Sequence, residues 1–213
     1  MAEGPEIPRL TKAQIVERAA LFLKQNHPSK TIPVPVEQMV EHLGLDIVPI
    51  PGLRKNFDLE ASTSVDKTRL YVDRWIAEHR ENRYRFSLAH ELGHIVLHSA
   101  LFDNIQSIVP DFAAWAEFTR SLPDVKHGSL EWQAYTFAGL ILVPPGRLAE
   151  EYERVLPGIR QRIREAENQG IPKQDAAEFA WDELASRIAP RFQVSKEVIL
   201  KRLAFDGFTP SKM

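Results

Sequence analysis

The stretch that decides the fold runs from residue 85 to residue 98 and reads RFSLAHELGHIVLH. Its apolar residues recur every three or four positions, which predicts a helix over residues 84–97 with one buried face. His90 and His94 are one helical turn apart, so both imidazoles can point at one position. Glu91 is offset from them by about 100° around the helix axis. Burying these groups is costly unless something satisfies them, so the stretch predicts a metal site.

The H-E-x-x-H pattern supplies two metal ligands and a general base from one rigid element. A zinc ion bound there lowers the pKa of its water to about 7, and Glu91 can take the proton as the water attacks a carbonyl. The alternative is a surface helix with incidental histidines, which the apolar flanks disfavour. The pattern therefore favours metal-dependent hydrolysis.

His98 continues the four-residue step, but we do not predict it to be the third ligand. On a straight helix it lies about 12 Å along the axis from His90, too far to share one ion. The three-histidine arrangement that does bind one metal inserts a glycine turn and has a longer spacing. We expect His98 to pack near the helix end or to contact a ligand side chain.

The third ligand should come from another element, and Glu131 is the candidate. It heads the segment EWQAYTFAGLILVP, which predicts an apolar helix over residues 130–142. Ala134 and Ala138 are small, which would let this helix approach the first one closely. Tyr135 lies one turn after Glu131 on the same face. On spacing alone, an acid in the first helical turn, favoured by the helix dipole, explains Glu131 equally well.

The composition limits the other kinds of site. Among 213 residues there are 27 Lys and Arg and 29 Asp and Glu, and the net charge of −2 gives no overall attraction to nucleic acid or membrane. The chain has no cysteine, which excludes disulfides, cysteine ligands and a thiol nucleophile. No apolar run is long enough to cross a bilayer, and the first residues do not resemble a secretory signal. We expect a cytoplasmic protein with no membrane partner.

The remaining segments predict an α+β fold that is mostly helical with a small sheet. Helices are predicted over residues 12–25, with Thr11 as cap, and 37–43, and strands over residues 46–50 and 68–72. From Arg147 onward the chain reads as two or three further helices. We expect a single domain over residues 1–213, with a metal core over about residues 84–145 and a helical part over about residues 146–208.

A long connection, residues 99–129, separates the two predicted ligand helices, and its middle, residues 111–122, is predicted to be helical. Its aromatic residues are Phe102, Phe112, Trp115 and Phe118. The connection is either a lid beside the site or a helical insertion with its own small apolar face, and the sequence leaves both open. The strand at residues 70–73 could offer an edge to an extended substrate.

RFSLAHELGHIVLH followed by EWQAYTFAGLILVP resembles the ImmA/IrrE family of metallopeptidases. In that family R-F-T-x-A-H-E-x-G-H precedes E-x-x-A-N-x-F-A-x-x-L-x-x-P. The upstream PVPVEQMVEHLGLDIV also resembles the family, so the similarity covers residues 15–144. The resemblance implies a zincin-like, thermolysin-type core with these site residues: His90, His94 and Glu131 as zinc ligands and Glu91 as general base. Mn²⁺ would also suit such a ligand set.

This chain departs from the family at one position, since Tyr135 stands where the family usually has Asn. The oxyanion that forms during hydrolysis needs a donor, and three residues have the chemistry to supply one: Tyr135, His127 and Tyr84. The sequence does not choose among them.

The resemblance implies a metalloendopeptidase that acts on one partner. In the family that partner is commonly a helix-turn-helix transcriptional repressor, and its cleavage switches on stress, mobile-element or phage-defence genes. The resemblance also implies an activating signal, for which single-stranded DNA is a candidate. We expect this chain to be the stand-alone form of the family.

A rival hypothesis rests on residues 184–203, LASRIAPRFQVSKEVILKRL, which read as helix, short turn and helix. Ser195 would cap the second helix, and Lys196, Lys201 and Arg202 would face phosphates. The chain would then be a DNA-binding regulator with a structural or vestigial metal site. A third hypothesis, an inactive relative that sequesters the repressor, is disfavoured by the intact H-E-x-x-H pattern.

Overall fold

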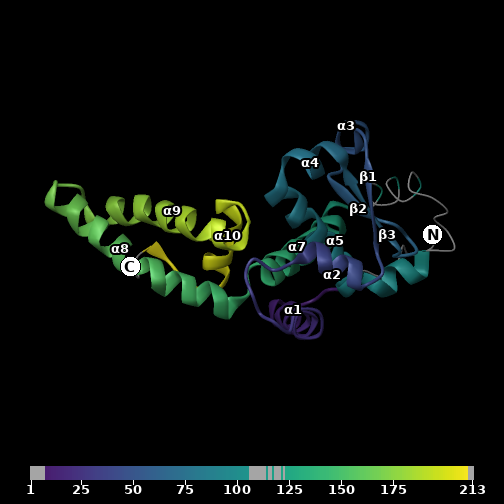
Figure 1. Cartoon of the computed structure of the whole chain (residues 1–213), viewed down its shortest axis with the longest axis horizontal. Coiled ribbons are helices and arrows are strands. Elements are labelled where there is room, and N and C mark those ends of the chain that lie inside the picture. The colour runs from purple at the N-terminus through teal and green to yellow at the C-terminus, as the bar shows by residue number, and fades with distance from the viewer. Residues whose placement is uncertain (1–7, 106–113, 115–116, 118–120, 122, 211–213) are drawn as a thin grey trace. The chain divides into compact units, whose positions relative to one another are not determined.

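The computed structural model describes residues 8–105, 114, 117, 121 and 123–210 (Figure 1). Its packing forms two compact units, which are Met1–Lys30 with Pro35–Ile141, and Thr31–Val34 with Leu142–Met213. The single domain over residues 1–213 stays a prediction, although the second unit begins near the predicted helical part. In the described ranges no helix combines the length and the apolarity that crossing a bilayer requires.

The first unit contains a three-stranded sheet in the order β1–β3–β2. β1 (Asp46–Ile50) pairs parallel with β3 (Arg69–Asp73), and β2 (Ala61–Thr63) pairs antiparallel with it. The prediction that residues 70–73 form an edge is therefore wrong, because β3 is the central strand. β2 was missed, since three residues reading Ala-Ser-Thr carry no alternating apolar pattern.

The first helices of this unit are α1 (Lys12–Asn26), α2 (Val36–His42), α3 (Leu53–Phe57) and α4 (Arg74–His79). The predicted cap of α1 is confirmed, because the Thr11 hydroxyl accepts a hydrogen bond from the Gln14 amide, and the two residues form a capping box. Phe22 of α1 packs edge-on against Phe137, with 5.5 Å between the ring centres. The α+β class is confirmed, with helices predominating over one small sheet.

The predicted ligand helix is longer than residues 84–97. It is α5 (Glu81–Ile105), and its backbone leaves the helical conformation at His98 (φ −119°, ψ 19°). Beyond that point its apolar residues Leu101, Phe102 and Ile105 form a small cluster with Leu130 from further along the chain. Phe102 is buried in this cluster, so it belongs to the core and not to a lid. Phe112, Trp115 and Phe118 lie outside the described residues, as does most of the segment 111–122.

The helix that carries Glu131 is α7 (Asp124–Leu142), which begins about two turns earlier than predicted. Glu131 is therefore not a first-turn acid, and the helix dipole does not explain it. Gly93 of α5 lies against α7. A Cβ at Gly93 would come within 3.0 Å of both the Cα and the carbonyl oxygen of Ala134, and within 3.3 Å of Cδ1 of Phe137. The predicted close approach at Ala134 is confirmed, and it requires glycine at position 93.

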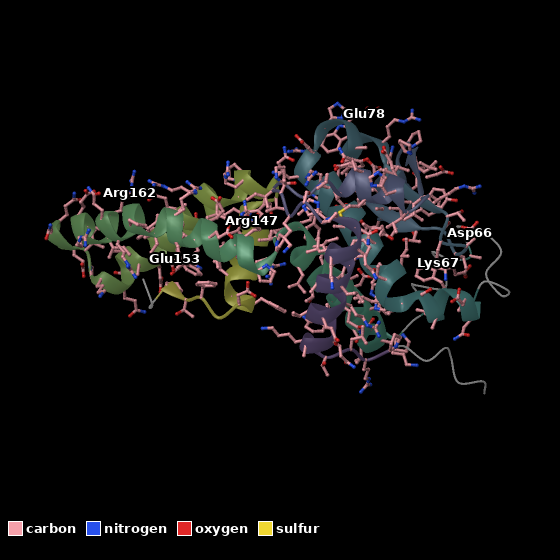
Figure 2. All side chains as sticks on the ribbon, turned by 60° about the horizontal axis from the view of Figure 1, so that its bottom comes forward. Asp66, Lys67, Glu78, Arg147, Glu153 and Arg162 are labelled. Carbon is pink, nitrogen blue, oxygen red and sulfur yellow. The ribbon has the colours of Figure 1, made fainter. Side chains whose placement is uncertain are left out.

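The turn between β2 and β3 is tied to the far end of α5. Lys67, which Figure 2 labels at this turn, donates to the Ser99 hydroxyl at 2.8 Å and to the Asp103 carboxylate at 2.5 Å. The neighbouring Asp66 carboxylate accepts hydrogen bonds within the turn from the Thr68 amide and hydroxyl. These contacts fix the hairpin that carries β2 on the surface of α5.

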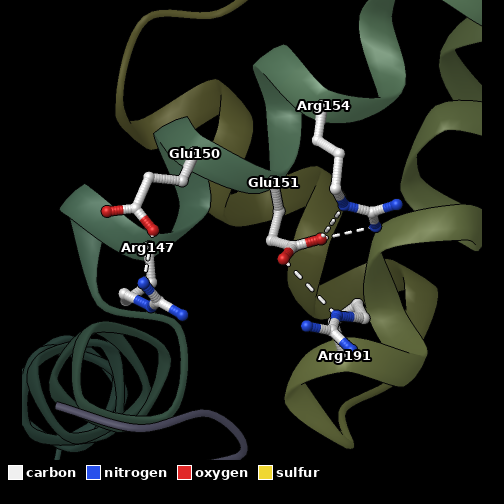
Figure 3. Close-up of polar contacts among 5 residues, drawn as sticks. All are labelled: Arg147, Glu150, Glu151, Arg154 and Arg191. Carbon is white, nitrogen blue, oxygen red and sulfur yellow. Dashed lines mark hydrogen bonds and ion pairs between the residues drawn. The ribbon is translucent and has the colours of Figure 1, made fainter.

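The second unit contains α8 (Pro145–Asn168), α9 (Lys173–Phe192) and α10 (Lys196–Phe205). Pro145 occupies the first turn of α8, where its missing N–H costs nothing. The buried Glu151 carboxylate of α8 accepts from Arg154 at 2.7 Å and from Arg191 of α9 at 3.4 Å (Figure 3). This ion-pair cluster joins the two long helices of the unit.

The α9–α10 junction presents only part of the basic face that the rival hypothesis needs, because Lys201 is exposed but the other two residues are engaged. Ser195 caps α10 as predicted. Arg202, however, is buried, and its guanidinium donates to the Asp206 carboxylate at 2.9 Å and to the Val143 carbonyl at 3.3 Å. The prediction that Arg202 faces phosphates is wrong, because the residue lies on the inner side of α10. Lys196 is paired with Asp182 at 2.9 Å.

Gly93→Ala should lower the free energy of unfolding by about 1–3 kcal/mol, because the added methyl group would meet backbone atoms of α7 that cannot rotate away. Urea denaturation measures the change. The control is Gly128→Ala on α7, where a Cβ has no neighbour within 4 Å. That variant should be unchanged or up to about 1 kcal/mol more stable. Equal stability of the two variants would contradict a tight α5–α7 contact.

Candidate metal centre

Three side chains from two helices converge in the first unit. The Nε2 atoms of His90 and His94, on α5, are 3.0 Å apart. From α7, the carboxylate oxygens of Glu131 lie 3.1 Å from Nε2 of His90 and 3.4 Å from Nε2 of His94. One ligand atom from each residue lies within 4.8 Å of the others. The structure thus brings together the three residues that the sequence suggested as ligands.

The chemistry of this donor set fits a metal cation. A neutral imidazole carries a single N–H, so the three close contacts among the two Nε2 atoms and the Glu131 carboxylate cannot all be hydrogen bonds at once. Protonating both rings would place two positively charged imidazoles side by side, with their Nε2 atoms only 3.0 Å apart, where they repel each other. A cation among the three groups would meet every lone pair at once, and imidazole with carboxylate is a common ligand set for transition-metal ions.

The charges of the cluster also favour a cation. Burial opposes ionisation of Glu131, but the facing imidazoles of His90 and His94 outweigh it and hold the pKa of its carboxyl well below the usual range. Burial likewise lowers the pKa of His94, but Glu131 and Glu91 outweigh it, so the net shift is upward. The carboxylate is therefore ionised at neutral pH and creates a negative potential at the two imidazoles.

Glu91 lies outside the ligand set, as its offset on the helix predicted. Its carboxylate is buried, and Oε2 accepts a hydrogen bond of 2.8 Å from the Thr63 hydroxyl of β2. Sequence reasoning missed Thr63, because nothing in a three-residue strand marks it as a partner of the H-E-x-x-H helix. The general-base candidate is thus fixed by the sheet and not only by its own helix.

His98 contacts His94, a candidate ligand, which is one of the two roles expected for it. It is fully buried, with Nδ1 3.1 Å from Nδ1 of His94 and Nε2 3.4 Å from Oε1 of Gln133. Burial, and next the neighbouring His94, lower the pKa of His98 to about 3, so its ring is neutral at physiological pH. Gln133 is a second residue of the site that the sequence did not single out.

Of the three residues that could donate to the oxyanion, Tyr135 is the one that packs against a candidate ligand, His90. Its ring centre lies 4.5 Å from that of His90 and 5.6 Å from that of Phe86, and about half of its surface is exposed. Burial, and then Glu131, raise the pKa of its hydroxyl, which stays protonated at neutral pH and can donate a hydrogen bond. Tyr84 instead lies near the carboxylates of Glu37 and Glu41 on α2. Burial is the largest cause of its raised pKa, and these two carboxylates raise it further. His127 is exposed.

Comparison with known protein families gives a match over most of the chain. Residues 41–204 match the family model described as peptidase M78, IrrE N-terminal-like domain. The match covers well over half of the chain and includes both helices that carry the converging side chains. No curated protein matches the chain.

Glu131→Ala should lower the affinity for zinc by at least about 100-fold, since even the loss of a residue that only orients a ligand costs about 10–100-fold. Elemental analysis of protein supplied with zinc and then desalted measures the bound metal. Glu60→Ala is the control, because Glu60 is a nearby acid that pairs with Arg83 and lies outside the ligand set. Full zinc content in the Glu131 variant would rule out this ligand set.

Proposed function

This chain belongs to the peptidase M78 family, and from that premise we propose that it is a zinc-dependent endopeptidase. The observation that carries the proposal is the convergence of His90, His94 and Glu131 beside a separately held carboxylate, Glu91. A His/His/Glu set with a nearby acid suits zinc hydrolysis, although manganese would also accept these ligands.

When bound, zinc would act as a Lewis acid that lowers the pKa of a water molecule to about 7. The side chains supply the proton transfers. Thr63 engages Oε2 of Glu91 in the described structure, so Oε1 can accept a proton and later deliver it to the leaving amide nitrogen. The Tyr135 hydroxyl, at the exposed rim beside His90, is placed to donate to a developing oxyanion.

The substrate would bind as an extended segment along β2. Among the residues that the structure describes, this strand pairs with β3 alone and is an outer strand of the sheet. Thr63 links it directly to Glu91, so a peptide paired with its other side would lie close to the general base. The exposed side chains of Trp132 and Tyr135 on α7 would contact apolar residues of that peptide.

The resemblance to the ImmA/IrrE family supports a finer proposal for the biological role. The substrate is a helix-turn-helix transcriptional repressor, and its cleavage derepresses stress, mobile-element or phage-defence genes in the cytoplasm. Single-stranded DNA is a candidate for the activating signal. The rival role, a DNA-binding regulator that uses α9 and α10, has less support because Arg202 is buried and Lys196 is paired.

Glu91→Gln should reduce peptide cleavage by about 10²–10⁴-fold, because the amide cannot accept the proton that the carboxylate takes. Zinc content should stay the same, since Glu91 is not among the converging ligand atoms. A quenched fluorescent peptide library, followed by the helix-turn-helix repressor encoded nearest in the genome, provides the substrates. Cleavage by this variant at the rate of the unaltered protein would overturn the role given to Glu91.

Thr63→Val should lower kcat about tenfold, because it removes the donor to Oε2 of Glu91 while keeping the shape of the side chain. Thr63→Ser is the matched control, since it keeps the hydroxyl and should retain most of the activity. Thermal unfolding of both variants checks that β2 is intact. If the valine and serine variants were equally active, the hydrogen bond would have no part in positioning Glu91.

A further inference from the structure

A chain of hydrogen bonds runs behind the ligand cluster, from the segment before α1 to His94. Gln133 of α7 directs Nε2 to the Pro8 carbonyl at 2.9 Å and to the Ser129 hydroxyl at 3.1 Å. Its Oε1 lies 3.4 Å from Nε2 of His98. Nδ1 of His98 lies 3.1 Å from Nδ1 of His94. Both His98 and Gln133 are 1% exposed, so bulk water does not compete for these contacts.

The direction of this chain is set at the Pro8 carbonyl. A carbonyl oxygen can only accept, so the Gln133 group that faces it must be the NH₂ group. Oε1 of Gln133 then faces His98 and can only accept, so Nε2 of His98 must carry the proton. A neutral imidazole has a single N–H, so Nδ1 of His98 holds a lone pair.

The same reasoning reaches the ligand. Because Nδ1 of His98 accepts, Nδ1 of His94 must donate, and a neutral His94 then has its lone pair on Nε2. Nε2 is the atom of His94 that lies 3.4 Å from Glu131 and 3.0 Å from Nε2 of His90. The tautomer that the hydrogen bonds impose is therefore the one that a metal ligand needs.

We propose that the Pro8 carbonyl, Gln133 and His98 form a directional hydrogen-bond chain that fixes the tautomer and ring orientation of His94 before a metal binds. His98 and Gln133 are positioning residues, since they act through His94. The inference rests on the proposed metal site, and it assigns a purpose to the third histidine of the four-residue series, which supplies no ligand atom.

The other histidine of the cluster is held differently. Nδ1 of His90 is buried and has no hydrogen-bond partner among the residues that the structure describes. Its ring instead packs against Tyr135, with ring centres 4.5 Å apart. Hydrogen bonding thus selects a tautomer for His94 only, and substitutions in the chain should act through that ligand.

The test is titration with Co²⁺ alone, which is followed by visible absorption and by competition with a chelator. His98→Phe keeps a ring of similar size but removes the acceptor, and it should weaken Co²⁺ binding about 10–100-fold and alter the absorption bands. His98→Asn can return an amide oxygen to accept from Nδ1 of His94, and it should recover most of the affinity. Unfolding of the metal-free variants, measured with chelator present, separates binding from folding.

Gln133→Leu keeps His98 but removes the group that orients it, and should weaken Co²⁺ binding by about tenfold. The variant that combines His98→Phe with Gln133→Leu should bind Co²⁺ no more weakly than His98→Phe alone, because Gln133 acts only through His98. Additive losses, or unaltered affinity and spectrum in both single variants, would overturn the chain. If the unaltered protein bound no Co²⁺ at all, the proposed metal site itself would fail, which is a distinct result.

Discussion

The contact between Gly93 of α5 and Ala134 of α7 is the constraint on which the site depends. Two of the converging side chains come from α5 and the third comes from α7, so their separation is set by how closely these helices approach. A Cβ at position 93 would lie 3.0 Å from backbone atoms of Ala134, and that gap leaves room only for a hydrogen. The same register aligns three pairs across the interface, which are His90 with Tyr135, His94 with Glu131, and His98 with Gln133.

The helix that carries the site is also a core element, and this explains why its polar groups need partners. Leu88, Ala89 and Leu92 are fully buried around the histidines. A polar or charged group left unpaired in such surroundings costs several kcal/mol, about as much as a small domain can lose. Two of these polar groups are held from another element, Glu91 by Thr63 of β2 and His94 by Gln133 of α7, which acts through His98.

The sequence was sufficient for the parts of the site that lie on one helix. The four-residue step placed His90 and His94 together and Glu91 beside them, because the geometry of a helix is fixed by its hydrogen bonds. Glu131 needed the family resemblance, since Gly128 and Ser129 before it look like a loop although α7 begins at Asp124. Contacts between distant segments, such as Thr63 with Glu91, leave no periodic signal.

The sequence pattern also could not predict which basic side chains are exposed to solvent. Arg202 belongs to a basic stretch that predicts a solvent-exposed face. Its guanidinium is nevertheless buried and donates to Asp206 and to a backbone carbonyl. Long basic side chains can bury their stems and still pair their heads, so composition alone does not separate an inward arginine from an outward lysine. The periodicity of Ile199 and Leu203 locates the inner face, but not how far that face extends.

The partners that hold the site come from segments far apart in the chain. Thr63 belongs to the hairpin that Lys67 ties to α5, Gln133 belongs to α7, and the Pro8 carbonyl precedes α1. A metal site built from these side chains would require the helices and the hairpin that carry their partners to be folded, because the orientation of the side chains depends on long-range contacts. Metal binding and folding of this unit should therefore be coupled, and free energy released on binding would stabilise contacts well beyond the ligands themselves.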